Sequence, residues 1–320
     1  MRSLLYMAMP LSLLATPAAA QTFPSKPIRF VVPFAAGGPA DTIGRTFGEK
    51  FSALVGQPVV IENRGGAGGM TGVAAVAKSE PDGHTLAIAT AGTLALNVVL
   101  QTKMPYDPLK DLTLLTQAVA VPELLVVGAK VPANSVKELV ALAKSQPGKI
   151  TFASSGNGSM PHLASELLKV SAGLDIAHVP YKGAAPAVGD IIGGHVQMMF
   201  ADIPVLLGNV QAGKLRALAV GSSKRAPSLP DVPTTGEAGF PQVLAENWYG
   251  IVAPANLPAA VAAKLHPLVV SALKSDEVTT KLAKQGAIVV ASSTADFSAY
   301  VRSEIERWSK IAKSAGMKLK

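Results

Sequence analysis

The sequence predicts an α/β protein of two lobes, and three observations lead to this prediction. Short apolar runs alternate with helical patterns, which is typical of a parallel sheet with helices packed on it. The 320 residues exceed what a single hydrophobic core usually supports. One design also occurs twice: an apolar run, a glycine-rich loop and a helix start fill residues 29–41 and again residues 150–162.

Each of these two loops is expected to bind an anion. A helix that starts beside a glycine loop leaves its first backbone N–H groups unpaired, and the positive end of its dipole points into the loop. Glycine also lets a ligand approach the backbone closely. Two such loops in one chain suggest two lobes that close on one carboxylate.

The expected strands and helices form two series. The first has strands at 28–32, 59–62 and 85–89 and helices at about 39–55 and 70–79. The second has strands at 124–127, 150–153, 176–179, 196–200 and 215–220 and helices at about 136–145, 160–172, 185–193 and 204–212. Turn signals at Pro81-Asp-Gly83 and Gln146-Pro-Gly148 separate helices from strands.

The end of the chain is expected to return to the first lobe. Three prolines between residues 226 and 233 indicate an irregular linker. The last helix, at about 295–315, has apolar residues at intervals of three or four, so one stripe should be buried on the first lobe. We therefore expect lobe 1 to comprise residues 21–124 and 226–320, and lobe 2 residues 125–225.

Residues 1–20 are expected to form a secretory signal peptide. Their single charge, Arg2, precedes an apolar stretch, and Ala18 and Ala20 suit cleavage before Gln21. No later segment reaches the roughly 20 apolar residues of a membrane span. The chain has no cysteine, so neither a lipid-anchored cysteine nor a disulfide is available. These features predict a soluble protein of the periplasm.

The charge pattern favours a small anionic ligand over nucleic acid. The formal net charge is +8, but Lys and Arg are dispersed and no basic run is interleaved with aromatic residues. The five histidines include no pair at helical metal-ligand spacing. We expect no metal and no cofactor, and a monomeric chain.

Candidate ligand contacts of the first loop surround a predicted helix start. Pro39 suits the first helical position, which makes Gly38 the N-cap and puts Asp41 in the first turn. Asp41 either contacts the ligand or only caps the helix. The candidates of this loop are Phe34, Ala35, Ala36, Gly37, Gly38 and Asp41.

Further candidates follow later strands. Ser159 is expected to cap the helix that starts at Met160. His162, which the helix dipole should keep neutral, either contacts the ligand or packs locally. Lys182 is either a counter-ion or a solvated side chain, and Tyr181 is a candidate wall of the pocket. The candidates of these loops are Thr90, Ala91, Thr93, Ser155, Gly156, Asn157, Gly158, Ser159, His162, Tyr181, Lys182, Gly183 and Ala184.

Several motifs stand in an order that resembles one known family. They are residues 23–41, Glu62-Asn-Arg-Gly-Gly-Ala-Gly-Gly69, Pro81-Asp-Gly-His-Thr85, Pro105-Tyr-Asp107, Ser155-Gly-Asn-Gly-Ser159 with His162-Leu-Ala164, Val179-Pro-Tyr-Lys-Gly183 and Leu229-Pro-Asp-Val-Pro-Thr234. Over essentially its whole mature length, the chain is similar to the substrate-binding proteins of tripartite tricarboxylate transporters, also called Bug receptors.

The resemblance implies a two-lobed periplasmic-binding-protein fold of type II. Each lobe would be a mixed, mostly parallel sheet flanked by helices, with the ligand cleft between the lobes. The resemblance also implies a receptor that closes on a small carboxylate, held largely by backbone groups and ordered waters, and hands it to membrane permease subunits. One segment departs from the family: in Phe200-Ala-Asp202 the acidic residue does not directly follow the aromatic one, so Asp202 is a candidate contact at a shifted position.

Two alternatives stay open beside transport. The first is a receptor that presents its closed form to a sensor kinase, since a sensor and a permease both bind the closed state. The second is a secreted hydrolase, which the sequence disfavours: Gly156-Asn-Gly-Ser159 is not a Gly-x-Ser-x-Gly elbow, and no acid is placed to orient His162. Di- and tricarboxylates, acidic amino acids and aromatic carboxylates all remain candidate ligands.

Overall fold

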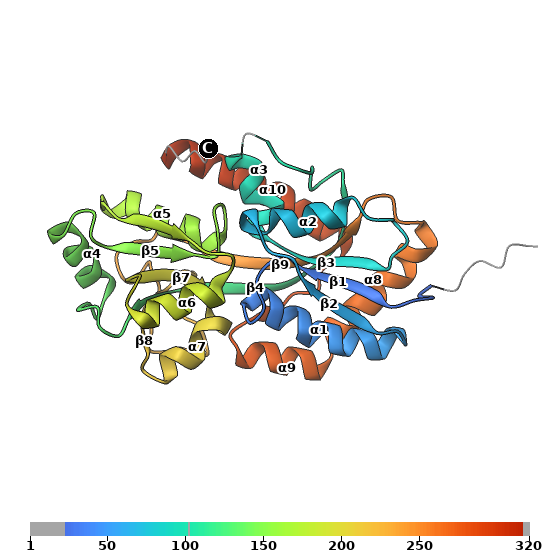
Figure 1. The fold of residues 1–320 in the computed structure, drawn as a ribbon, viewed down its shortest axis with the longest axis horizontal. Coiled ribbons are helices and arrows are strands. Elements are labelled where there is room, and N and C mark those ends of the chain that lie inside the picture. Colours follow the sequence, from blue (N-terminus) through green and yellow to red (C-terminus); the bar gives the residue numbers. More distant parts are fainter. Residues whose placement is uncertain (1–22, 102, 316–320) are drawn as a thin grey trace, which may run out of the picture.

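The computed structural model describes residues 23–101 and 103–315, drawn in Figure 1. The signal peptide expected at residues 1–20 lies outside the described residues. The molecule is elongated, and the two halves of one ten-stranded sheet lie side by side. Within the described part of the chain, no helix has both the length and the apolar character needed to cross a membrane.

The strands are β1 (Ile28–Val32), β2 (Val59–Asn63), β3 (Thr85–Thr90), β4 (Leu112–Gly128), β5 (Thr151–Ser154), β6 (Ala177–Pro180), β7 (Met198–Asp202), β8 (Leu215–Val220), β9 (Glu246–Pro254) and β10 (Ile288–Val289). The α-helices are α1 (Pro39–Val55), α2 (Met70–Ala77), α3 (Asn97–Leu100), α4 (Val136–Ser145), α5 (Met160–Ala172), α6 (Ala184–Gly193), α7 (Ile203–Gln211), α8 (Ala259–Leu273), α9 (Asp276–Lys284) and α10 (Thr294–Ala315). A short 3-10 helix, η1 (Ala67–Gly69), and a π-helix, η2 (Gly92–Leu96), complete the described elements.

The strand order is β2-β1-β3-β9-β4-β7-β5-β6, with β8 and β10 also paired to β4. In the first half, β1 is parallel to β2 and β3, and β9 is antiparallel to β3 and β4. In the second half, β5 is parallel to β6 and β7, and β4 is antiparallel to β7 and β8. Each half is therefore a mixed sheet, as expected, but the expected mostly parallel pairing holds only within β1–β3 and among β5, β6 and β7, because β4 and β9 pair antiparallel with all their partners.

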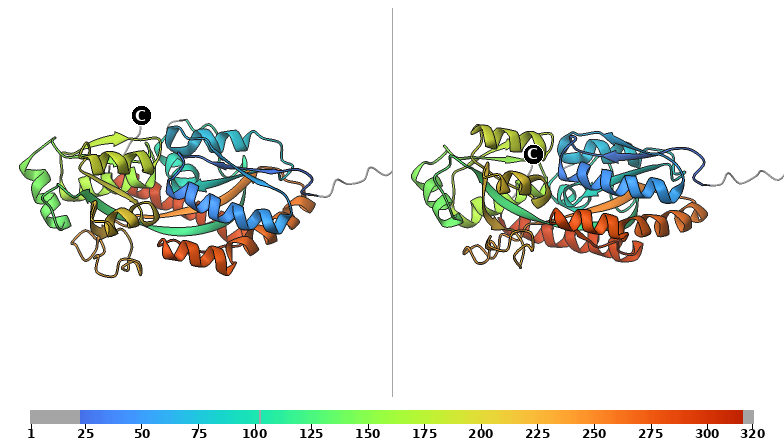
Figure 2. Two further views of the ribbon diagram at one scale, coloured as in Figure 1. Left: turned by 60° about the horizontal axis from the view of Figure 1, so that its bottom comes forward. Right: turned by 90° about the horizontal axis from the view of Figure 1, so that it is seen from below.

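The long strand β4 belongs to both halves. Its residues 112–122 pair with β9, and its residues 123–128 pair with β7 and β8. In Figures 1 and 2, β4 runs from one half of the molecule into the other. The sequence places the start of this strand at 124, which is wrong: Pro122 and Glu123 interrupt the apolar pattern, but the strand continues through both residues.

Helices cover both faces of each half. In the first half, α1, α8 and α9 pack together on one face, and α2, α3 and α10 cover the other. In the second half, α5 and α4 pack against one face of the sheet, and α6 and α7 against the other. One hydrophobic cluster contains buried residues of both halves, from Val31 and Ala87 to Phe152 and Met198. The two halves therefore share apolar packing in addition to β4.

The ends of α1 follow the predicted chemistry. The helix begins at Pro39 after an extended Gly38, and it ends at Gly56, which has the left-handed φ of +70° that favours glycine. Three predicted strands begin within two residues of the observed starts at β5, β6 and β7. By contrast, the sequence assigns no element between 237 and 294, where β9, α8, α9 and β10 lie.

Helix α10 packs on the first half through a close contact with β9. Phe297, Val301 and Trp308 are at most 2% exposed, which confirms the predicted buried stripe. The Phe297 ring lies over Gly250: a Cβ atom at Gly250 would come within 2.1 Å of that ring. Glycine is therefore required at this point of β9 because the helix approaches the strand so closely.

We expect Gly250→Ala to lower the free energy of unfolding by about 1–3 kcal/mol, because the added methyl group overpacks this contact. Phe297→Leu should also destabilise, but the double variant should lose less than the sum of the two changes, since the smaller side chain makes room for the methyl group. Urea denaturation measures all three variants. Gly189→Ala, exposed on α6 with no atom within 4 Å of its added Cβ, is the control; strict additivity would contradict this packing.

Candidate functional site

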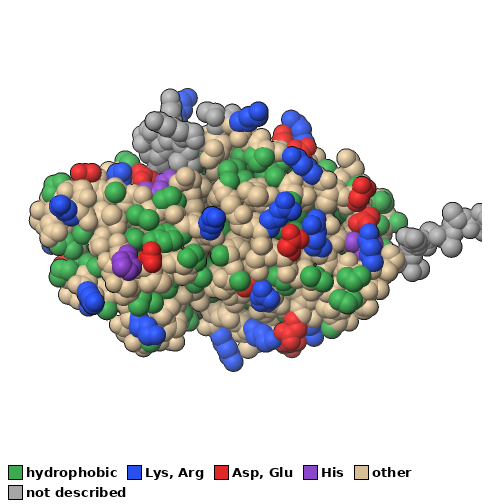
Figure 3. Space-filling model, in the orientation of Figure 1, with side chains coloured by type: hydrophobic (Ala, Val, Ile, Leu, Met, Phe, Trp, Pro, Cys, Tyr) green, Lys and Arg blue, Asp and Glu red, His purple; other side chains and the backbone are tan. Residues whose placement is uncertain are grey.

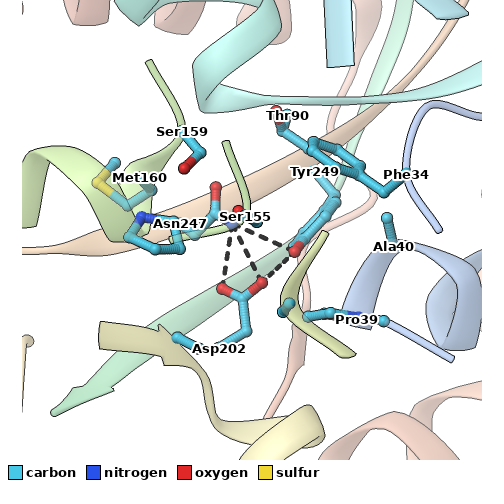
Figure 4. A pocket seen from close by; sticks show the side chains of 14 residues that line it. Phe34, Pro39, Ala40, Thr90, Ser155, Ser159, Met160, Asp202, Asn247 and Tyr249 are labelled. Carbon is cyan, nitrogen blue, oxygen red and sulfur yellow. Dashed lines mark hydrogen bonds between the residues drawn. The ribbon is translucent and has the colours of Figure 1, made fainter. Parts of the chain in front are cut away.

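A pocket lies where the two halves meet, shown in Figure 4. Both halves of the sheet contribute residues to its wall. They are Phe34, Gly38, Pro39, Ala40, Thr90, Ser155, Ser159, Met160, Pro161, Ala184, Ala201, Asp202, Asn247 and Tyr249.

Three helices begin at this pocket. Residues of the first turns of α1, α5 and α6 line it: Pro39 and Ala40, Met160 and Pro161, and Ala184. The first i→i−4 bonds are donated by Thr42 N–H to Gly38 (3.0 Å) in α1 and by Leu163 N–H to Ser159 (3.1 Å) in α5. The N–H groups before them have no partner in their own helix. The pocket thus lies at three positive helix ends, which suits an anion.

The loops of the two halves touch at the rim of the pocket. Ala35 N–H donates to the carbonyl of Lys182 at 3.2 Å, and the Asn97 amide donates to the carbonyl of Gly158 at 3.3 Å. A Cβ at Gly68 would lie 2.2 Å from the carbonyl oxygen of Asn157. The structure is therefore a closed arrangement, in which backbone meets backbone across the cleft.

Asp41 stabilises the first loop and does not line the pocket. Its carboxylate accepts from Gly37 N–H, Arg45 Nε and Asn63 Nδ2, each at 2.9 Å. Burial acts to raise the pKa of Asp41, but these hydrogen bonds together hold it below its usual value. Of the first-loop candidates, Phe34 and Gly38 line the pocket, whereas Asp41 fixes the loop before α1.

In the second loop, Ser155 and Ser159 line the pocket. Ser159 is the N-cap residue of α5, but the predicted side-chain cap is wrong. Its hydroxyl donates to the carbonyl of Gly156 at 2.7 Å, so it closes the loop instead of accepting from the helix. Gly158 has a φ of +71° and packs against Asn97, so any side chain there would collide with that amide.

His162 lies behind the second loop. Its Nδ1 accepts from Gly158 N–H at 3.2 Å, and its ring stacks on His178 with centroids 4.1 Å apart. His178 in turn stacks on Phe152 and lies 2.6 Å from the Ser154 hydroxyl. Burial, together with nearby positive charge, lowers the pKa of His162 to about 3 and that of His178 to about 4. The neutral imidazole rings of His162 and His178 thus support the second loop from behind.

The remaining candidates divide between the pocket and its rim. Thr90 lines the pocket, while Thr93 exchanges hydrogen bonds with Thr90 and does not. An adjoining rim cavity shares Phe34 and Ser155 with the pocket and is also lined by Gly156, Asn157, Tyr181 and Lys182. The Tyr181 hydroxyl donates to Asp190 at 2.5 Å. Ala35, Ala36, Gly37, Ala91, Gly158 and Gly183 lie in these same loops without lining the pocket.

Asp202 lines the pocket with two residues that the sequence did not identify. It ends β7, and its carboxylate accepts from Asn247 Nδ2 (3.1 and 3.2 Å) and from the Tyr249 hydroxyl. Figure 4 shows both side chains directed at this carboxylate. Asn247 and Tyr249 lie on β9, a strand without a clear sequence signal, which explains why they were missed.

In Figure 3, Lys and Arg are scattered among acidic and apolar side chains instead of forming one patch. The described residues contain no cluster of three or more His, Cys, Asp or Glu that could hold a metal ion. Ser154 and His178 form the pair most similar to a hydrolytic one, but Ser154 is completely buried and does not line the pocket.

The two stacked histidines predict an acid-sensitive fold. In the folded state His162 has a pKa of about 3 and stays neutral above that pH. In the unfolded chain the same imidazole has its ordinary pKa, so it binds a proton as the pH falls below about 6.5. Stability should therefore fall as the pH drops, by up to about 2 kcal/mol for this residue between pH 6.5 and 5. His162→Gln keeps an acceptor for Gly158 and should flatten this dependence, whereas the exposed His195→Gln should not. Urea denaturation from pH 7.5 to 5 measures both; an unchanged slope in His162→Gln would refute the assignment.

Comparisons with known proteins agree with the fold. The family model "Tripartite tricarboxylate transporter family receptor" matches residues 43–317. The chain is 37% identical to protein BugT of Bordetella pertussis over 308 residues, which are 96% of this chain and 94% of BugT. Among solved structures, the periplasmic binding protein BugD has a TM-score of 0.89 at 33% identity, covering 92% of this chain and 99% of BugD. Rpa4515 of R. palustris, solved with adipate, has a TM-score of 0.89 at 37% identity and the same coverage.

These comparisons confirm the predicted periplasmic-binding-protein fold and the resemblance that the motifs indicate. The match extends over nearly the whole described chain and over nearly the whole length of each relative. The chain therefore belongs to the tripartite tricarboxylate transporter receptor family, the family of the Bug periplasmic solute-binding proteins.

Proposed function

We propose that this protein captures a small carboxylate in the pocket between its two sheet halves and delivers it to the membrane permease of a tripartite transporter. The observation that carries the proposal is the convergence of three helix N-termini, from both halves, on one pocket. The adipate bound in the related Rpa4515 structure is itself a carboxylate and supports the same chemistry. We assign the protein to binding rather than to catalysis.

Backbone donors alone supply enough affinity. A hydrogen bond to a charged group contributes roughly 1.5–3 kcal/mol net, and a micromolar dissociation constant corresponds to about 8 kcal/mol. About four to six such bonds reach this value even after the cost of ordering the cleft is subtracted. A dedicated arginine is therefore unnecessary, and the pocket lining contributed by residues 23–101 and 103–315 contains none.

In this proposal, the two halves are lobes, with residues 21–124 and 226–320 in one and 125–225 in the other. Opening would bend β4 near Glu123, where its partner changes from β9 to β7. A ligand that contacts both lobes binds the closed form better and shifts the population toward it. Both a permease and a sensor kinase would recognise the closed form. Uptake of the bound acid by cells that lack this gene separates the two roles, because only a transport role requires the gene for uptake.

The ligand class can be tested by thermal denaturation of the chain from Gln21 onward. We expect an acid of the correct class, at about 100 times its dissociation constant, to stabilise the fold by roughly 2.7 kcal/mol and raise the melting temperature. The corresponding amide or methyl ester should give no shift, because it lacks the anion that the helix N-termini bind. Equal shifts for acid and amide would contradict a carboxylate site.

Gly38→Val tests the position of the site. Gly38 lines the pocket, and its backbone is extended rather than left-handed, so the fold accommodates a side chain that then occupies ligand space. We expect binding to weaken at least about 100-fold, as measured by isothermal titration calorimetry. Gly189→Val, on the exposed side of α6, should bind like the parent. Unchanged binding by Gly38→Val would place the ligand elsewhere.

A further inference from the structure

The wall of the pocket carries one charged side chain, that of Asp202. Among the described residues that line the pocket there is no Lys, Arg or His to balance it. In Figure 4, Asp202 lies on the side of the pocket away from Thr90 and Ser159. The wall of the pocket therefore combines helix N-termini with one carboxylate, so it is not uniformly suited to anions.

The donors beside Asp202 are already used. Asn247 Nδ2 reaches both oxygens of Asp202 and the Tyr249 hydroxyl oxygen at 3.2 Å, and the Tyr249 hydroxyl donates to Asp202. The Asn247 carbonyl oxygen accepts from Trp248 N–H at 3.0 Å. What this wall still offers a ligand is the remaining lone pairs of the Asp202 carboxylate, which are acceptors.

A second carboxyl group lies beside Asp202. Glu123 on β4 is the direct cross-strand neighbour of Asp202 and is completely buried. The only hydrogen-bond partner that the described residues offer the Glu123 carboxyl group is Asp202 itself. Burial, the neighbouring Asp202 charge and a side-chain hydrogen bond with Asp202 raise the pKa of Glu123 well above its usual value. Burial raises the pKa of Asp202 only to about 6, since Tyr249 and Asn247 stabilise its ionised form.

Asp202 accepts hydrogen bonds from Asn247 and Tyr249, an arrangement that favours its ionised form, and none of the described residues that line the pocket is a basic side chain that would compensate the charge. A second ligand carboxylate at this wall would meet a like charge in a partly desolvated site. An ammonium, amide or hydroxyl group would instead donate to Asp202. Asp202 is also the N-cap residue of α7, but its side chain makes no capping hydrogen bond, so helix capping does not explain the carboxylate.

We propose that Asp202 selects carboxylates whose far end carries a hydrogen-bond donor, above all an ammonium group, over ligands with a second carboxylate. This inference rests on the proposed function, because it assumes that the helix N-termini hold the first carboxylate. It narrows the ligand to amino, amido or hydroxy carboxylates, and it makes Asp202 a specificity-determining residue.

The test is a calorimetric titration of the parent protein with two matched series. The first is butyrate, 4-aminobutyrate, 4-hydroxybutyrate and succinate; the second is benzoate, its 4-aminomethyl and 4-hydroxymethyl derivatives, and terephthalate. In any series that binds, we expect the ammonium compound to bind at least about tenfold more tightly than the dicarboxylate, with the hydroxyl compound between them. A dicarboxylate that binds as tightly as the ammonium compound, or more tightly, overturns the inference and leaves the proposed function standing. If no carboxylate in either series binds, the proposed function itself is refuted, and the inference with it.

Asp202→Asn assigns the selectivity to this side chain. The ratio of ammonium to dicarboxylate affinity should fall about tenfold, because the wall loses its charge while the side-chain volume is kept. The exposed Asp175→Asn makes the same chemical change away from the pocket and should leave the ratio unchanged. A ratio that Asp202→Asn does not alter overturns the assignment. If this variant does not fold, Asp202→Ser replaces it, and the parent series decides the proposal without either variant.

Discussion

The pocket depends on one strand that pairs with different partners along its length. Because β4 is continuous over 17 residues, β9 lies along its first part and β7 along its last part. Val121 is opposite Asn247, and Glu123 is opposite Asp202. Asp202 and Asn247, which are 45 positions apart in the sequence, therefore meet where the pairing partner of β4 changes. A shift of one residue in either pairing would turn these side chains to the other face of the sheet.

The same strand brings the helix N-termini together. Each of the helices α1, α5 and α6 begins just after a parallel strand, on the side of the sheet where that strand ends. With the two halves facing each other across β4, their helix starts point at a common space. Gly68 and Gly183 then allow close approach: a Cβ at Gly68 would clash with the backbone at Asn157, and one at Gly183 would press within 3.3 Å of Ala35. Glycine is needed here because the two halves meet through their backbones.

Sequence reasoning succeeded where the signal is local. The Gly38-Pro39 boundary fixes the start of α1 through backbone chemistry alone, and the spacing of Phe297, Val301 and Trp308 defines the buried stripe of α10. Sequence reasoning failed where contacts between distant segments determine the structure. Pro122 and Glu123 read as a break in an apolar run, yet pairing with β7 and β9 keeps them in a strand. Asn247 and Tyr249 have no motif of their own, and only the register with β4 places them beside Asp202.

The residues of the proposed site that local sequence signals predict differ in role from those that only the tertiary structure brings together. The proposed carboxylate contacts are backbone N–H groups at the helix starts, and the glycine loops before these helices are recognisable in the sequence. Asp202, Asn247 and Tyr249 are instead side chains of β7 and β9. In this chain, the wall that they form holds an acidic side chain whose neighbouring donors are already engaged. In the proposed function, recognition of a carboxylate depends on the helix starts, whereas discrimination among carboxylates depends on Asp202, Asn247 and Tyr249.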